Sequence, residues 1–269
     1  MAPRMAPAEA RGTTTWRRPV AGVVVGYGVE REVGEAIPEA AAWWASELDP
    51  TETGLRFKLT ARDRDESWLV ESPLFGAHNV ENIVGVFAAL EGLGVGVDEL
   101  IPVIRLHQGV KRRQEIRGVV AGVTVIDDFA HHPTAVQGTI EAIAQRHAGS
   151  RVIALLEPRT NTSRRAIFQD DYVRALMAAD RIAIAEVGDD PIYSITGEVT
   201  ECLSAEAVAE SLRSEGRDAA AFEEIAQIVD WVVAGRQEGD VVLVMSNGAF
   251  GGIWEKLLVA LDAASNGSR

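Results

Sequence analysis

From residue 119 onward, short apolar runs alternate with longer segments of helical periodicity, and this alternation constrains the fold more than any other feature. The apolar runs are rich in β-branched residues, which is typical of strands buried on both faces. The predicted strands cover residues 123–128, 151–158, 181–187, 219–222 and 240–246. The predicted helices cover residues 134–147, 170–179, 204–216, 225–235 and 253–264. This order predicts an α/β fold, Rossmann-like, with a mostly parallel sheet and helices on both of its faces.

The chain before residue 119 follows a different pattern. Apolar or alternating runs predict strands at residues 20–28, 54–63 and 67–73. Helical periodicity then predicts helices at residues 76–95 and 97–110. The change of pattern indicates that this part of the chain is a separate α/β region.

The length of 269 residues suggests two domains. We expect the joint in the basic and polar run KRRQEIRG, which gives domains at residues 20–110 and 111–269. Residues 1–19 lack the apolar stretch of a secretory signal and are expected to form a disordered leader.

Three loops follow the carboxyl ends of predicted strands, where sheets of this class bind their ligands. They read DDFAHHPT, EPRTNTSRR and SNGAFGG, at residues 127–134, 157–165 and 246–252. Since parallel strands end at the same edge of a sheet, we expect the three loops to share one site.

The first loop allows two interpretations. Asp127 and Asp128 could end a strand and cap the next helix, for which Thr134 is also a good residue, or a carboxylate could accept hydrogen bonds from ribose hydroxyls. His131 and His132 lack the cysteine or carboxylate spacing of a zinc site, so no metal is expected, and a ligand contact or a cap is favoured.

The other two loops could recognise an anionic substrate. Arg159, Arg164 and Arg165 could simply make an exposed loop soluble, or their guanidinium groups could bind carboxylates or phosphates in pairs of hydrogen bonds. The third loop contains Ser246, Asn247 and Gly248 and brings bare backbone N–H groups to the start of a helix, which favours an anion.

Charge and composition narrow the classes of partner. A net charge of -14 argues against a nucleic-acid partner and an anionic membrane surface, because both need a positive field. No run of roughly 20 apolar residues suggests a membrane span. A single cysteine, Cys202, excludes an internal disulfide framework and a cysteine metal cluster. The cytoplasm is the expected compartment.

Two common nucleotide motifs are missing from the sequence. There is no G-x-x-x-x-G-K-[ST] phosphate loop, and no G-x-G-x-x-G follows a strand. The chain alone therefore lacks the standard means of activating a nucleoside triphosphate.

Five stretches together resemble the Mur ligase family of peptidoglycan synthesis: GAHNVENIVGVFAAL, GVKRRQE, VIDDFAHHPTAV, EPRTNTSRR and VMSNGAFGGIWEKLL. The resemblance covers residues 20–262 and is greatest to the branch that recycles muropeptides. It implies the end of the family's central ATPase domain followed by its C-terminal, peptide-binding domain.

The resemblance also implies roles for single residues. His78 and Asn82 would contact adenine, Asp128 would bind the ribose, and Arg113 would approach the phosphates and stabilise their charge during catalysis. The residues expected to face the tripeptide are Arg159, Arg164, Ser246, Asn247 and Gly248, with His131 and His132 as weaker candidates. The implied nucleotide is ATP with Mg²⁺, whose ligands would lie mostly outside this chain.

The family branch joins L-alanyl-γ-D-glutamyl-meso-diaminopimelate to UDP-N-acetylmuramate through an acyl phosphate. Without the phosphate loop we expect the chain to be inactive alone, unless an upstream half completes it in trans. Two alternatives stay open: a stand-alone peptide- or partner-binding module with the same fold, or a fragment of the related alanine-adding ligase.

Overall fold

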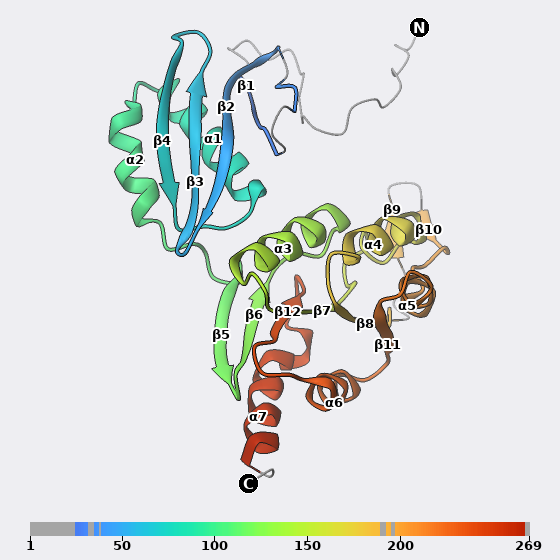
Figure 1. Ribbon diagram of the computed structural model, residues 1–269. Helices are drawn as coiled ribbons and strands as arrows, with labels where there is room; N and C mark the ends of the chain where they lie inside the picture. The colour runs from blue at the N-terminus through green and yellow to red at the C-terminus, as the bar shows by residue number, and fades with distance from the viewer. Residues whose placement is uncertain (1–24, 32–34, 38, 189–191, 195–196, 267–269) are drawn as a thin grey trace, which may run out of the picture. The chain divides into compact units, whose positions relative to one another are not determined.

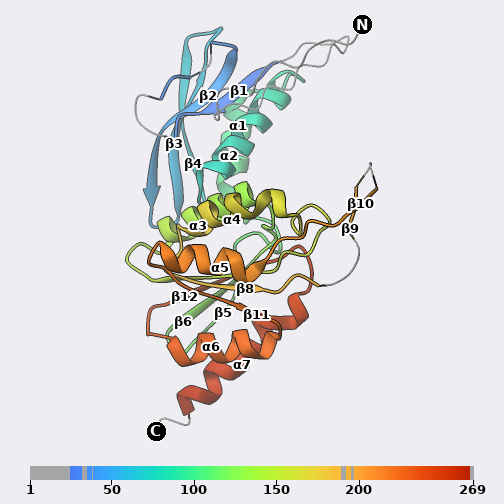
Figure 2. The ribbon, with the colours of Figure 1, turned by 90° about the vertical axis from the view of Figure 1, so that its right-hand side faces the viewer.

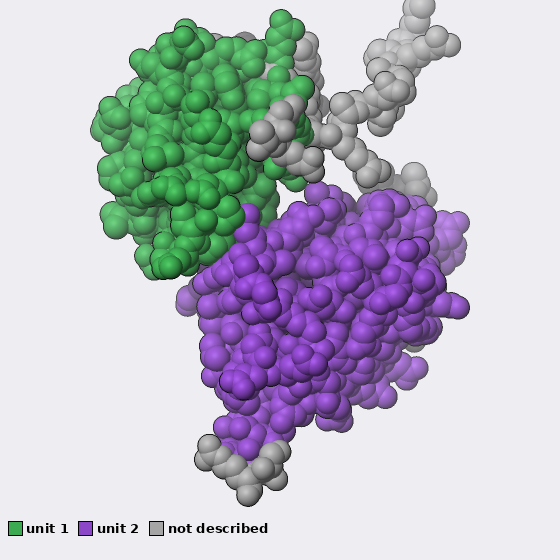
Figure 3. All heavy atoms as spheres, viewed as in Figure 1, with its two compact units in different colours: residues 1–108 green, residues 109–269 purple. Residues whose placement is uncertain are grey.

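The computed structural model describes residues 25–31, 35–37, 39–188, 192–194 and 197–266. The chain divides into two compact units, residues 1–108 and 109–269, which Figure 3 colours separately. Each unit has its own hydrophobic core. The division falls close to the expected joint, and the assignment of the units to family domains stays a prediction.

Unit 1 contains a four-stranded sheet in the order β1-β2-β3-β4. Its strands are β1 (Gly26–Val29), β2 (Ala41–Thr51), β3 (Gly54–Ala61) and β4 (Glu66–Ser72). Strand β1 is parallel to β2, and the other pairs are antiparallel. In β3 the buried Leu55, Phe57 and Leu59 alternate with more exposed polar residues, which is the period-two pattern that places one face of a strand on the core.

Two helices of unit 1 follow its sheet, α1 (Ala77–Glu91) and α2 (Val97–Leu106). The buried Val80, Val84 and Phe87 of α1 recur at helical spacing and join the same core as β3. Strands β3 and β4 and both helices confirm the predicted elements. Residues 20–24 of the first predicted strand lie outside the described residues, and β2 was not predicted.

Unit 2 contains a six-stranded sheet in the order β11-β8-β7-β12-β6-β5. The strands are β5 (Glu115–Val120), β6 (Val123–Asp128), β7 (Val152–Leu156), β8 (Arg181–Ala185), β11 (Asp218–Phe222) and β12 (Val241–Met245). All neighbours are parallel except β5, which pairs antiparallel with β6. The five predicted strands are confirmed. The expectation that residues 111–118 form only a joint was wrong, because β5 begins inside that run and hydrogen-bonds along β6.

Helices cover both faces of this sheet, as Figures 1 and 2 show. One face packs against α3 (Pro133–Arg146), α4 (Gln169–Leu176) and α5 (Ala205–Ser214). The other face packs against α6 (Ile225–Gly235) and α7 (Ile253–Asn266). Successive strand residues therefore enter opposite cores: Leu243 and Met245 face α3–α5, and Val242 and Val244 face α6 and α7. The expected parallel sheet between two helical layers is confirmed.

The connection after β8 contains a hairpin that was not predicted, β9 (Ile192–Ser194) with β10 (Gly197–Val199). Short 3₁₀ turns at Ala166–Phe168 and Phe250–Gly252 precede α4 and α7. No helix in the described ranges combines the length and the apolar character that a membrane span requires.

Candidate functional site

The carboxyl ends of β6, β12 and β7 lie side by side in unit 2. Met245 is in register with Asp128 on one side and with Leu156 on the other. Two backbone hydrogen bonds continue the pairing past the strand ends: Ser246 N donates to Asp128 O at 3.0 Å, and Glu157 N donates to Met245 O at 3.0 Å. The three loops therefore begin at one edge of the sheet, as the parallel order predicts.

Ser246 holds the third loop in place rather than pointing outward. Its side chain is buried, its hydroxyl donates to the Glu157 carboxylate, and it accepts the N–H of Gly248 at 2.8 Å. The loop is thus tied to the second loop and to itself before any ligand arrives. The contact expected between Ser246 and a substrate stays a prediction, as does that of Asn247, whose side-chain oxygen is buried without a hydrogen-bond partner among the described residues.

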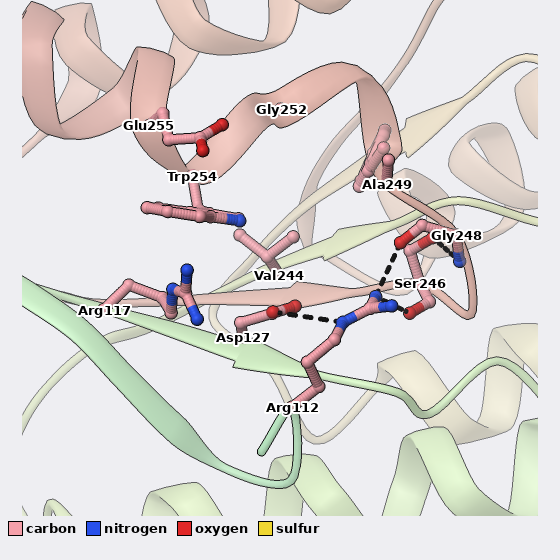
Figure 4. A pocket seen from close by; sticks show the side chains of 11 residues that line it. Arg112, Arg117, Asp127, Val244, Ser246, Gly248, Ala249, Gly252, Trp254 and Glu255 are labelled. Atoms are coloured by element: carbon pink, nitrogen blue, oxygen red, sulfur yellow. Dashed lines mark hydrogen bonds and ion pairs between the residues drawn. The ribbon is translucent and has the colours of Figure 1, made fainter.

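Arg112 ties the segment before β5 to the same loop (Figure 4). One of its terminal nitrogens donates to the carbonyl oxygens of Ser246 at 2.8 Å and Gly248 at 2.6 Å. Its Nε lies 3.3 Å from a carboxylate oxygen of Asp127, which is buried. The backbone of Arg112 has a positive φ of 58°, so a strained conformation is kept at this position. Since the guanidinium satisfies two carbonyls and a carboxylate at once, it fixes the loop around Gly248.

Asp128 is buried at the end of β6 and holds two loops by their backbones. Its carboxylate accepts Gln114 N at 2.8 Å and Ala130 N at 2.7 Å. Burial raises the pKa of this carboxyl, while the two N–H groups and the nearby Arg113 act in the opposite direction. With 2% of the residue exposed, almost none of it is open to a ribose, so the expected ribose contact stays a prediction.

The two histidines lie at the start of α3. The Nδ1 atom of His131 is 3.0 Å from the carbonyl oxygen of Phe129, and the Tyr172 hydroxyl donates to the carbonyl oxygen of His131 at 2.5 Å. His132 is exposed and its ring meets the ring of Phe168 edge-on, with 5.0 Å between centroids. His132 occupies the N-cap position of α3, so the alternative in which Thr134 caps this helix was wrong.

Arg159 and Arg164 differ in their surroundings, although both follow β7. Arg159 is exposed and its guanidinium lies against Gly248: a Cβ atom at that position would come within 2.0 Å of Nη1. Arg164 is 6% exposed and donates to the carbonyl oxygen of Gly188. The structure therefore brings Arg159 to the third loop, whereas Arg164 holds a neighbouring segment of its own unit. The proposed tripeptide contacts of both residues stay predictions.

The expected nucleotide residues fall in both units. Arg113 of unit 2 is exposed, and its guanidinium carbon lies 5.4 Å from the centre of the Phe129 ring. His78 and Asn82 lie one turn apart on α1 of unit 1, half-buried and exposed respectively. Their expected contacts with adenine, and that of Arg113 with phosphates, stay predictions.

Sequence reasoning missed a cavity of about 290 Å³ on the α7 side of the sheet (Figure 4). Its lining includes Arg112, Arg117, Asp127, Val244, Trp254 and Glu255. The guanidinium carbon of Arg117 lies 3.6 Å from the centre of the Trp254 ring. Asp127, Ser246 and Gly248 of this lining belong to loops that the sequence selects, whereas Arg112 and Arg117 lie in the basic run from which only a joint was expected. Among the described residues, no group of three histidine, cysteine or acidic side chains is arranged to hold a metal ion.

Comparison with known proteins identifies relatives for most of the chain. The chain is 35% identical, over 84% of its length, to the UDP-N-acetylmuramate–L-alanyl-γ-D-glutamyl-meso-2,6-diaminoheptandioate ligase of Escherichia coli K12, and this match covers 46% of that protein. It is 35% identical, over 77% of its length, to the UDP-N-acetylmuramate–L-alanine ligase of Chloroflexus aggregans, of which 43% is covered. The chain spans about half the length of the curated relatives that it matches.

Solved structures and the family comparison agree with these relatives. The crystal structure of a murein peptide ligase from Psychrobacter arcticus superposes with a TM-score of 0.61 at 27% identity, over 88% of this chain and 46% of that chain. A UDP-N-acetylmuramate–alanine ligase from Thermotoga maritima shares the fold, with a TM-score of 0.66 at 18% identity, over 86% of this chain and 47% of that one. Residues 112–248, half of the chain, match the family described as "Mur ligase, glutamate ligase domain". The chain therefore belongs to the Mur ligase family.

Proposed function

We propose that the chain supplies the peptide-binding part and a portion of the nucleotide site of an ATP-dependent ligase. This ligase joins L-alanyl-γ-D-glutamyl-meso-diaminopimelate to UDP-N-acetylmuramate in the recycling of peptidoglycan. The convergence of three motif-bearing loops at the ends of β6, β12 and β7 carries the proposal. The 35% identity to a ligase named for this tripeptide supports the choice of substrate.

The proposed reaction has two steps, formation of an acyl phosphate and formation of the amide. The carboxylate of UDP-N-acetylmuramate attacks the γ-phosphorus of ATP, which forms an acyl phosphate and releases ADP. The amine of the tripeptide then attacks the acyl carbon, loses a proton, and expels phosphate as the amide forms. Positioning both substrates and excluding water protects the acyl phosphate from hydrolysis.

Residues of unit 2 fit this chemistry by charge and exposure. The exposed Arg113 can stabilise charge that develops on the transferred phosphoryl group. The exposed Arg159 can pair with a peptide carboxylate in a bidentate manner. Both guanidinium groups lie beside loops that the fold already fixes, so binding would order few further groups.

The residues present fit the nucleotide in part. Exposed or half-exposed polar side chains at Asn82 and His78 suit an adenine contact within unit 1, and Arg113 suits phosphates within unit 2. Mg²⁺ would be carried mainly by the phosphates, because this ion keeps most of its ligands from water and substrate. A Thermotoga maritima MurF ligase that shares the fold at 19% identity was crystallised with ADP, in agreement with a nucleotide site in this architecture.

The tests are a binding and a turnover measurement. Calorimetry of the chain with the tripeptide, with and without ADP, should show binding of the peptide. A ligation assay with ATP and UDP-N-acetylmuramate should show no turnover by the chain alone, and adding a separately produced upstream half tests completion in trans. Turnover by the chain alone at the rate of a complete ligase would overturn the claim of incompleteness. Absence of tripeptide binding, together with a tight protein partner, would favour a stand-alone binding module.

A second candidate is part of an L-alanine-adding ligase, since curated enzymes of that name match the chain at similar identity. The same calorimetry separates the two candidates. Binding of L-alanine with no gain from the tripeptide would select the second candidate. We expect both forms of the proposal to operate in the cytoplasm.

A further inference from the structure

The cavity beside α7 is lined in part by Ser246 and Gly248 of the third loop, but the function proposed above assigns no chemical group of the substrate to it. It lies within unit 2, between β5, the ends of β6 and β12, and the first turn of α7 (Figure 4). Its volume of about 290 Å³ is enough for several non-hydrogen atoms of a ligand. The question is what chemical group its lining would accept.

The base of the cavity combines an apolar surface with one buried acid. Val244 and the ring of Trp254 supply the apolar part. The Asp127 side chain is 5% exposed, and among the described residues its ion pair is the 3.3 Å contact with Arg112, which also holds two carbonyl oxygens. A buried carboxylate has about four acceptor positions, so Asp127 retains capacity for a donor from a ligand.

Opposite charges stand at two further positions of the wall. Arg117 lies over the Trp254 ring and is 3.0 Å from Glu115, and its guanidinium has five N–H donors, which leaves some for another acceptor. Glu255 lines the rim and is exposed, and it makes no ion pair or hydrogen bond within the described part of the chain. The lining thus offers carboxylates for a cation and a guanidinium for an anion, across a small apolar base.

We propose that this cavity binds a zwitterionic α-amino-acid group. Its ammonium would lie between Asp127 and Glu255, its carboxylate would face Arg117, and its first methylene groups would pack on Trp254. A ligand with only a negative charge would be repelled by the two carboxylates, and one with only a positive charge would be repelled by the two arginines. A ligand that carries both charges can pair each with a residue of opposite sign, which offsets the loss of water around them.

This inference rests on the proposed function for the identity of the ligand. A peptide that ends in 2,6-diaminoheptandioate carries such a group, because the far end of that residue keeps a free amine and a free carboxylate. Gly248 lines the cavity, and the guanidinium of Arg159 lies against the same glycine. A peptide whose D-glutamyl carboxylate pairs with Arg159 would bring its terminal diamino acid toward the cavity.

Calorimetry with two peptides tests the assignment: the tripeptide, and the dipeptide L-alanyl-γ-D-glutamate, which lacks the diamino acid. The variant is Glu255→Gln, because that side chain is exposed and makes no hydrogen bond or ion pair within the described residues. The matched control is Asp262→Asn, which removes an exposed acid farther along the same helix. We expect Glu255→Gln to weaken tripeptide binding roughly three- to tenfold and to leave dipeptide binding unchanged, as for a partly exposed charged contact. Asp262→Asn should change neither.

The outcomes separate this inference from the function on which it rests. If both peptides bind and Glu255→Gln leaves the ratio of their affinities unchanged, the cavity does not hold the diamino acid, while the proposed substrate stands. If neither peptide binds, the proposed function fails.

If neither peptide binds, a direct probe still tests whether the cavity accepts a zwitterionic amino acid. Free meso-2,6-diaminoheptandioate is titrated into the chain, and the indole N–H signal of Trp254 is followed by NMR, with Trp254→Phe used to assign it. A saturable shift that is lost in Glu255→Gln supports the cavity. No shift at millimolar ligand overturns the proposal.

Discussion

The guanidinium of Arg112 donates a 2.6 Å hydrogen bond to the carbonyl oxygen of Gly248, across 136 positions of sequence. The same guanidinium reaches Ser246 and Asp127, so one side chain joins the segment before β5 to the ends of β6 and β12. The neighbouring Arg113 is the proposed phosphate contact. It therefore belongs to a segment that Arg112 attaches to the third loop.

Replacing Arg112 with methionine should loosen the third loop and lower stability. Two carbonyls and a carboxylate would lose a charged donor, and we expect the free energy of unfolding to fall by about 1–3 kcal/mol. Urea unfolding measures this change, and hydrogen exchange at the Gly248 amide should become faster. Arg174→Met is the matched control, because within the described part of the chain that exposed arginine makes a surface pair with Asp171 alone, and its loss should cost less than about 0.5 kcal/mol. Equal losses in both variants would contradict the role given to Arg112.

Arg159→Ala and Arg164→Ala should separate binding from stability. Arg159 is exposed, so its removal should weaken tripeptide binding about tenfold while the melting temperature stays unchanged. Arg164 is buried and holds the Gly188 carbonyl, so its removal should lower the melting temperature and weaken binding through the displaced loop. Calorimetry and thermal unfolding measure both. Unchanged affinity in Arg164→Ala would remove this residue from the site.

Tyr172 should make stability depend on pH at the alkaline end. Burial raises the pKa of its phenol above the ordinary value of 10.0. Below pH 10 the phenol is neutral in both the folded and the unfolded chain, so this group adds no pH dependence there. Above pH 10 the unfolded chain ionises first, so the contribution of Tyr172 is lost as the pH rises toward the folded pKa. Between pH 9 and pH 11.5 the free energy of unfolding should fall more steeply with pH for the wild type than for Tyr172→Phe. Equal slopes in the two proteins would contradict this.

Asp128 should titrate above the ordinary range of an aspartate, because burial raises its pKa from 3.8. Because the folded pKa is raised, the contribution of Asp128 to the free energy of unfolding is fully present below pH 3.8. It is lost as the pH rises through the folded pKa. The chemical shift of its carboxyl carbon, followed by NMR, measures the midpoint. A midpoint at or below 3.8 would show that the N–H groups of Gln114 and Ala130 outweigh burial.

The sheet of unit 2 could be predicted because its strands are continuous apolar runs between helical patterns. The convergence of the three loops followed from the same pattern, since parallel strands end at one edge. Strand β5 was missed because "EIRGVV" follows a basic run, and its position depends on pairing with β6. Strand β2 was missed because it contains Glu47, Asp49 and Pro50, which disfavour a strand by local preference, and antiparallel pairing with β3 overrides that preference.

The residue types of the site could be predicted, but their orientations could not. The sequence placed Asp128 and Ser246 at strand ends, and both side chains turn out to hold backbone groups of the fold. Arg112 and Trp254 could not be predicted as site residues, because their contacts join residues far apart in the chain and no local sequence pattern encodes them. Arg159 could be selected over Arg164 only once burial was known.

The position of β12 has a consequence for the order in which this unit can form during synthesis. It is the last strand of the sheet along the chain, yet it lies between β6 and β7, which do not pair with each other. A nascent chain that has emerged only as far as residue 240 has no central strand, and its first two ligand loops have nothing to bring them together. Such a late, long-range pairing slows folding and leaves the edges of β6 and β7 open until β12 has been synthesised. We expect the three loops of this unit to come together only after the segment that carries Ser246 has left the ribosome.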